Sequence, residues 1–126
     1  MITVLSGFPD DVVAVRATGR VTRDDYAQVL VPAIERALSS HKKLSFYYEL
    51  APEMQGFDVG AMWEDARVGI AHLTRWERIA VVTDVEWLRA AVNLFRFLVP
   101  AAVRVFGTGE AAEAKAWISQ PRAEHG

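Results

Sequence analysis

Apolar residues recur along this chain with two spacings, one typical of strands and the other typical of helices. In residues 44–50 every second position is apolar, so Leu44, Phe46 and Tyr48 share one face of a strand. Residues 77–83 are almost continuously apolar, which favours a central strand. Three further short runs are rich in β-branched or other apolar residues. The predicted strands are residues 1–5, 12–19, 44–50, 77–83 and 102–106.

Helical spacing, with apolar residues three and four positions apart, marks the segments between and after these strands. Thr22 and Asp25 have the spacing of a capping box, and Pro32 predicts a kink or a break in the helix that follows. Asp58 and Asp84 are predicted to cap the next two helices. The predicted helices are residues 22–39, 58–73, 84–100 and 110–119. The predicted packing residues of the last helix are Ala112, Ala116 and Trp117.

Strands that alternate with helices predict parallel pairing through right-handed crossovers. The first two strands are predicted to form an antiparallel hairpin at one edge of the sheet. Ser45, Tyr47 and Glu49 give the 44–50 strand a polar second face, so helices should lie mainly on one side. The predicted fold class is α/β, with a single, mostly parallel five-stranded sheet, an antiparallel N-terminal edge hairpin and helices mainly on one face. One domain should span residues 1–120, followed by a frayed tail at 121–126.

Residues 84–100 would have more apolar surface as a helix than one sheet face can cover. The four polar residues Glu86, Arg89, Asn93 and Arg96 form one narrow strip. They leave roughly 220° of the circumference apolar, where about 100° suffices for a surface helix. One apolar stripe comprises Leu88, Ala91, Val92, Phe95 and Val99, and the second comprises Trp87, Ala90, Leu94, Phe97 and Leu98. One stripe can dock on the core. The second must meet a neighbouring helix, a partner chain, an apolar ligand or a membrane surface.

Composition argues against several classes of function. The 126 residues have a formal net charge of −2 with scattered Lys and Arg, which argues against nucleic-acid binding. The absence of cysteine removes disulfides and thiol catalysis. His41, His72 and His125 lie too far apart for a histidine metal site, and no cofactor-binding motif occurs. The absence of a signal peptide and of an uncharged run of about 18 residues predicts a cytoplasmic protein that does not span a membrane.

Six carboxylates cluster around the second and third predicted helices. They are Glu49, Glu53, Asp58, Glu64, Asp65 and Asp84. A pair of them could perform acid and base catalysis if burial separated their pKa values. Helix capping and solvation explain these residues better, so the sequence predicts a protein that is not an enzyme.

Several groups of residues together resemble the SpoIIAA-like family, which shares the STAS-type fold of anti-anti-sigma factors. They are residues 19–26, the motifs Gly56-Phe57-Asp58 and Met62-Trp63-Glu64-Asp65, residues 77–82 with Asp84 and Trp87, and residues 102–106 with Ala116-Trp117. The resemblance spans nearly the whole chain and keeps the order of the elements. It implies the fold, whereas an activity does not follow from a fold.

Regulatory STAS proteins bind a partner kinase and are switched by phosphorylation of a Ser or Thr at the start of the helix after the third strand. The matching region here is residues 58–60, and residues 51–73 contain neither Ser nor Thr, so this switch does not carry over. The resemblance to the SpoIIAA-like branch implies instead a small bacterial protein that binds apolar, lipid-like molecules and associates loosely with membranes through mobile helices.

The surplus apolar surface and this resemblance lead to one hypothesis, a non-enzymatic binding protein for an apolar or lipid-like ligand with peripheral membrane association. The ligand would lie between the helices at 58–73 and 84–99. The candidate ligand-binding residues are Phe57, Met62, Trp63, Trp87, Leu94 and Phe97. Arg89 and Arg96 would contact a membrane or an anionic head group. Core packing of the aromatic residues and solvation of the arginines are the alternatives.

A second hypothesis is a STAS-type protein interaction module. In it, the same apolar stripe of residues 84–100 contacts a partner protein or a second copy of the chain, which would make the protein a homodimer. Co-purifying lipid would favour the first hypothesis, and a lipid-free dimer with an occluded stripe would favour the second.

Overall fold

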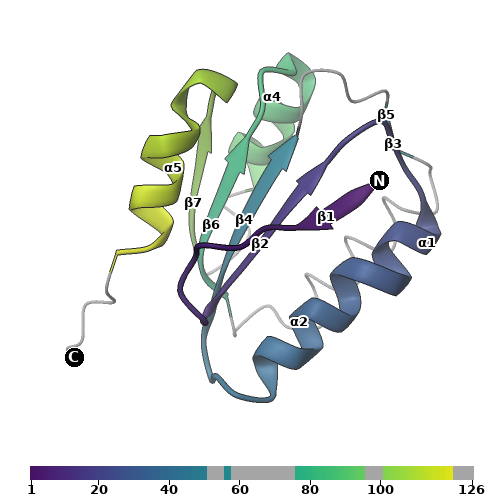
Figure 1. Cartoon of the computed structure of the whole chain (residues 1–126). Helices are drawn as coiled ribbons and strands as arrows, with labels where there is room; N and C mark the ends of the chain where they lie inside the picture. Colours follow the sequence, from purple (N-terminus) through teal and green to yellow (C-terminus); the bar gives the residue numbers. More distant parts are fainter. Residues whose placement is uncertain (51–55, 58–75, 96–100, 121–126) are drawn as a thin grey trace.

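The computed structural model describes residues 1–50, 56–57, 76–95 and 101–120. Its centre is one five-stranded sheet in the order β1-β2-β4-β6-β7 (Figure 1). The strands are β1 (Ile2–Val4), β2 (Val12–Ala17), β4 (Leu44–Leu50), β6 (Trp76–Val82) and β7 (Ala102–Phe106). β1 runs antiparallel to β2, and all other neighbours are parallel. This confirms the predicted sheet with its antiparallel edge hairpin.

A second, two-stranded sheet was not predicted. β3 (Arg20–Val21) pairs in parallel with β5 (Gly56–Phe57), with Arg20 opposite Gly56 and Val21 opposite Phe57. Strands of two residues are too short to show alternation of apolar and polar positions, so the sequence carries no signal for them. The small sheet ties the chain just before the first helix to the chain just after β4.

The helical elements follow the predicted order. They are α1 (Arg23–Asp25), the π-helix η1 (Tyr26–Leu30), α2 (Val31–Leu38), α4 (Glu86–Phe95), the 3₁₀ helix η3 (Thr108–Glu110) and α5 (Ala111–Ile118). The helix predicted at residues 58–73 and the tail predicted at 121–126 lie outside the described residues, as does the end of the helix predicted to reach residue 100.

The start of the first helix has the predicted capping box. The Thr22 backbone N–H donates to Asp25 Oδ2 at 2.8 Å, and the Asp25 N–H donates back to Thr22 Oγ1 at 3.3 Å. The interruption predicted from Pro32 is also present, because the π-helix η1 separates α1 from α2 and Pro32 lies in the first turn of α2. A proline lacks a backbone donor, so the irregular turn falls where the ordinary hydrogen-bond ladder is broken.

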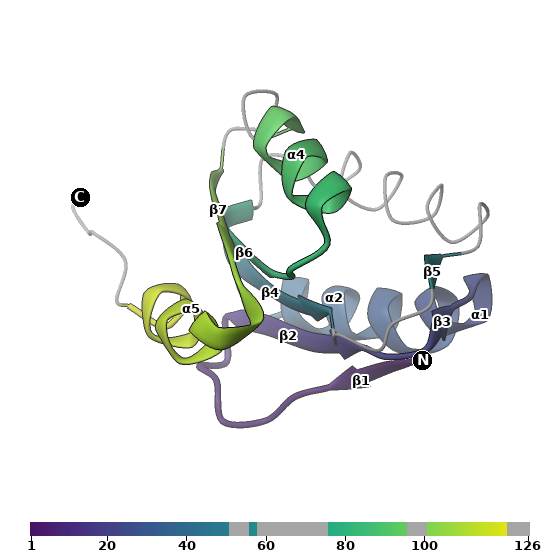
Figure 2. The same cartoon turned by 90° about the horizontal axis from the view of Figure 1, so that it is seen from above.

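Helices cover both faces of the sheet, but unequally. Figure 2 shows α2 and α4 on one face and α5 on the other. The core beneath α2 is built from Val13, Val15, Leu30, Ile34, Leu44, Tyr48, Leu50 and Trp76 with their neighbours. The core beneath α5 is smaller and comprises Ala14, Tyr47, Ala80, Val82, Phe106, Ala114 and Ile118. Helices therefore lie mainly on one face, and α5 is the exception.

Two expectations change because α5 occupies the second face. Tyr47, predicted on a half-covered face, is only 2% exposed and packs at 4.8 Å between ring centroids against Phe8. On α5 itself the buried residues are Ala114 and Ile118, whereas the predicted Ala112 and Ala116 are exposed. Ala114 and Ile118 are four positions apart and so share a helix face, which the alanine-rich sequence alone does not distinguish.

Candidate functional site

α4 begins at the carboxyl ends of the parallel strands, the edge at which open α/β sheets place ligands. The connection from β6 is fixed by backbone and side-chain contacts. The Val85 N–H donates to Thr83 Oγ1 at 3.1 Å, and Arg89 Nη1 donates to the Thr83 carbonyl at 2.9 Å. Arg89 is half-buried. Its guanidinium therefore joins α4 to the end of β6.

Asp84, predicted to cap α4, serves another element. Its carboxylate accepts the Thr108 backbone N–H at 3.0 Å and also the Thr108 hydroxyl. These hydrogen bonds lower the pKa of Asp84, and the contact with the Thr108 hydroxyl has the largest effect. The carboxylate therefore stays ionised at a lower pH than that of an ordinary aspartate. The partner that the structure shows for Asp84 comes from the chain after β7, far from Asp84 in sequence, and α4 itself begins at Glu86.

Gly107 lies where these groups converge. A Cβ atom at this position would be 3.1 Å from Asp84 Oδ1, closer than Cβ atoms normally pack, and 3.4 Å from Glu110 Oε1. Its own N–H donates to Glu110 Oε1 at 2.7 Å. The glycine thus permits the chain after β7 to approach the carboxylate of Asp84, and a Cβ atom here would require the Asp84 side chain to shift by a few tenths of an ångström.

The second apolar stripe of α4 remains uncovered where the structure describes it. Leu94 is 73% exposed, and Ala90, one turn earlier on the same stripe, is also exposed. Val92, from the stripe predicted to dock on the core, is half-buried. These three residues agree with the predicted asymmetry, in which one side of α4 packs on the protein and a second apolar side does not.

The predicted ligand-binding residues are described to different extents. Met62, Trp63, Phe97 and Arg96 lie outside the described residues. Phe57 is placed in β5 and Trp87 in α4, without a description of their side chains. Leu94 and Arg89 are fully described. Leu94 lies on the exposed side of α4, and Arg89 lies on the side that contacts the end of β6. The proposed cluster of aromatic residues therefore stays a prediction.

Two of the six candidate carboxylates are described, and each has a structural partner. Glu49 lies with Oε2 3.3 Å from Arg16 Nε, and its Oε1 accepts the Tyr47 hydroxyl at 2.8 Å. Burial and this carboxylate raise the pKa of Tyr47 above its usual range. Asp84, which follows β6, accepts hydrogen bonds from Thr108. The remaining four, Glu53, Asp58, Glu64 and Asp65, lie outside the described residues.

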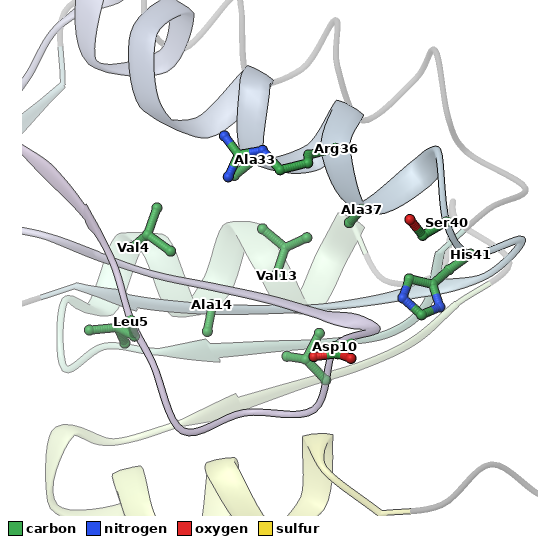
Figure 3. A pocket seen from close by; sticks show the side chains of 11 residues that line it. Val4, Leu5, Asp10, Val13, Ala14, Ala33, Arg36, Ala37, Ser40 and His41 are labelled. Atoms are coloured by element: carbon green, nitrogen blue, oxygen red, sulfur yellow. The ribbon is translucent and has the colours of Figure 1, made fainter.

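A groove that the sequence did not predict lies between the β1–β2 hairpin and the end of α2 (Figure 3). Its volume is about 470 Å³. Val4 and Val13 from the hairpin and Ala33 and Ala37 from α2 form its apolar part, and Arg36 lies at its rim. Val13 and Ala14, which also lines the groove, are buried, whereas Val4 is exposed. No motif marks such a groove, because it depends on how the hairpin and helix pack.

Two types of feature are absent from the described segments. Within residues 1–50, 56–57, 76–95 and 101–120 there is no group of three or more His, Asp or Glu side chains that could hold a metal ion. In the same segments, no helix has both the length and the apolar composition needed to cross a bilayer.

Comparison with known proteins identifies the fold and the family. A solved structure, that of an uncharacterized protein from the DUF3478 family with a SpoIIAA-like fold from Shewanella loihica PV-4, matches with a TM-score of 0.72. The two sequences are 24% identical, and the match covers 94% of this chain and 92% of the other. No curated protein matches the sequence. The SpoIIAA-like family matches residues 12–119, which is most of the chain. The chain therefore belongs to the SpoIIAA-like family.

Proposed function

We propose that this protein is a non-enzymatic, cytoplasmic binding protein for an apolar or lipid-like molecule, and that it associates peripherally with membrane surfaces through α4. The supporting observation is the 73% exposure of Leu94 on a helix whose other side packs on the protein. A leucine in this setting loses its contact with water when it meets an apolar ligand or the acyl region of a bilayer. The exposed Ala90 extends the same surface by one turn.

The proposed ligand lies between α4 and residues 58–73. Phe57, Met62, Trp63, Trp87, Leu94 and Phe97 would supply the apolar contacts. Each buried methylene of an acyl chain contributes about 0.8 kcal/mol, so a chain of moderate length reaches useful affinity without polar chemistry. Arg96 would contact an anionic head group. Arg89 would do so only with the donors that its contact to the Thr83 carbonyl leaves available.

The fold supports a second candidate, a STAS-type module that binds another protein. In that case the exposed stripe of α4 would contact a partner chain or a second copy rather than a lipid. Residues 51–73 contain neither Ser nor Thr, so such a module would act without the phosphorylation switch of regulatory STAS proteins.

Flotation with vesicles tests the membrane proposal directly. Vesicles of phosphatidylcholine with phosphatidylglycerol should carry the wild-type protein to the top of a density gradient. Leu94→Asp should abolish or strongly reduce flotation, because it places a charge on the apolar contact surface. Ala112→Asp is the matched control, since it introduces the same charge at an exposed position of α5 and should leave flotation unchanged. Equal flotation of the two variants would contradict the role of α4.

Native mass spectrometry of the gently purified protein tests ligand binding separately. Co-purifying lipid that is lost in Leu94→Asp would support the binding proposal. A lipid-free protein that does not float with vesicles would instead favour the protein interaction module.

A further inference from the structure

The two edges of the main sheet differ in chemistry. At the β7 edge, Arg104 lies in the middle of the strand, with its guanidinium 4.8 Å from the ring centre of Phe106 and 5.4 Å from that of Trp117. Charged residues on an edge strand discourage pairing with another strand. The β1 edge, Ile2–Val4, has no charge and no proline, and all three residues are β-branched. The β1 edge is therefore much the better suited to pairing with a further strand.

The backbone of β1 presents hydrogen-bonding groups on its outer side. The Met1 carbonyl accepts the Thr18 N–H at 2.8 Å, and the Leu5 N–H donates to the Ala14 carbonyl at 2.8 Å, so odd-numbered residues face β2. Because bonding alternates along an antiparallel strand, the N–H and C=O groups of Ile2 and Val4 point away from β2. None of the described residues pairs with them. Val4 is 53% exposed, whereas Ile2 is only 4% exposed, so the outward groups of Val4 are the accessible ones.

The helical segment beside β1 has charges of opposite sign at its two ends. α1 lies near the start of β1, as the 3.4 Å contact between the Met1 ammonium and Asp25 shows, and the adjacent Asp24 is exposed. Near the end of α2, Arg36 is exposed and lines the same groove as Val4 (Figure 3). Neither Asp24 nor Arg36 forms an ion pair with any of the described residues.

We propose that the β1 edge binds a second copy of this chain, with the two β1 strands antiparallel about a two-fold axis. A two-fold axis brings each surface against its own copy, so the contact must be self-complementary. β1 meets this condition because Val4 of each copy can offer its outward N–H and C=O groups to Val4 of the other copy. Antiparallel pairing also places the start of each helical segment beside the end of the other. Asp24 of each copy then faces Arg36 of the other copy, which gives two symmetry-related pairs of opposite charge.

The variant Val4→Pro tests the strand contact selectively. It removes the outward N–H of residue 4 while leaving the odd-numbered bonds to β2 in place, and proline is tolerated on edge strands. Sedimentation velocity over a concentration series should show a wild-type dimer, and Val4→Pro should raise its dissociation constant by at least about tenfold. Val4→Thr retains both the N–H and the β-branched shape, so this control should dimerise like the wild type. A wild-type protein that is monomeric at every concentration overturns the proposal.

Charge reversal tests the orientation of the two copies. Arg36→Glu alone and Asp24→Arg alone should each raise the dissociation constant by about threefold to tenfold at low salt, because each places like charges together. The double variant Asp24→Arg/Arg36→Glu should recover dimerisation. Glu113→Arg, at an exposed position of α5, is the control and should have no effect. A dimer that tolerates Val4→Pro and both single reversals is formed elsewhere, and a double variant as weak as the singles contradicts the antiparallel arrangement. Should Val4→Pro fail to fold by circular dichroism, the charge reversals decide alone.

Discussion

The carboxylate of Asp84 accepts two hydrogen bonds from Thr108, 24 residues later in the chain. Asp84 follows β6 and precedes α4, whereas Thr108 follows β7 and begins η3. The contact therefore ties the entry of α4, the helix of the proposed binding surface, to the connection that leads into α5. Gly107 leaves the space that this approach requires.

We expect the variant Asp84→Asn to unfold at a lower temperature than the wild type at neutral pH, with a difference that vanishes in acid. The hydrogen bonds from Thr108 lower the pKa of Asp84 in the folded state, so the ionised carboxylate stabilises the fold above the ordinary pKa of about 4. This stabilisation is lost as the pH falls through the lowered pKa. Thermal unfolding measured between about pH 2 and pH 7 checks the expectation. A difference that is independent of pH would contradict it.

Tyr47 should resist ionisation until the protein unfolds. Burial, together with the Glu49 carboxylate, raises the pKa of Tyr47 in the folded protein, whereas an unfolded tyrosine ionises near pH 10. The folded state is therefore favoured below about pH 10 and loses stability as the pH rises further, because only the unfolded chain releases this proton. Denaturation monitored with tyrosinate absorbance provides the measurement. Tyr47→Phe should show a weaker loss of stability at high pH, and an unchanged loss would assign the effect to other groups.

Replacement by leucine should affect stability differently at two alanines of α5. Ala114 is fully buried on the side of α5 that packs on the sheet, whereas Ala112 is exposed. Ala114→Leu should lower the free energy of unfolding by about 1–3 kcal/mol, because the added methyl groups have no space in the packed core. Ala112→Leu should change it by less than about 0.5 kcal/mol. Urea denaturation of both variants distinguishes the packing face observed here from the one predicted from the sequence, for which the order of the two effects would be reversed.

The capping box of α1 should contribute measurably to stability. Thr22→Ala removes the hydroxyl that accepts the Asp25 N–H at 3.3 Å, and a lost N-cap typically costs about 1 kcal/mol. The exposed Ser6 provides a control of similar chemistry, since Ser6→Ala should leave the free energy of unfolding nearly unchanged. Urea denaturation measures both. Equal values for Thr22→Ala and the wild type would show that the hydroxyl contributes no net stabilisation.

The features that the sequence predicted correctly depend on residues near one another in the chain. Alternation in Leu44–Leu50 identified β4 and separated its two faces, and the spacing of Thr22 and Asp25 identified the capping box. Pro32 located the irregular turn before α2 because its missing donor acts on its own helix. On α4 the spacing of apolar residues placed Leu94 on a second stripe beside the docking stripe, and Leu94 is exposed in the structure.

The features that the sequence did not predict depend on distant partners. The role of Asp84 requires Thr108, the burial of Tyr47 requires α5, and β3 exists only because β5 lies beside it. The groove beside Val4 likewise depends on the packing of a hairpin against α2. None of these contacts leaves a local pattern, so a single sequence cannot reveal them. For the proposed lipid site, the structure describes the side chains of Leu94 and Arg89, and the positions of the others are predictions from the sequence.

The parallel pairing of the central strands has a kinetic consequence. Val12 pairs with Ser45, Ser45 with Arg78 and Arg78 with Ala102, so each contact closes a long loop before it contributes any stabilisation. Among the strand pairs that the structure describes, only the β1–β2 hairpin is local in sequence. Refolding should therefore be slow for a chain of this size. Until β2 and β4 pair, the backbone hydrogen-bonding groups of both strands are unpaired. The chain should therefore be most prone to aggregation during this interval.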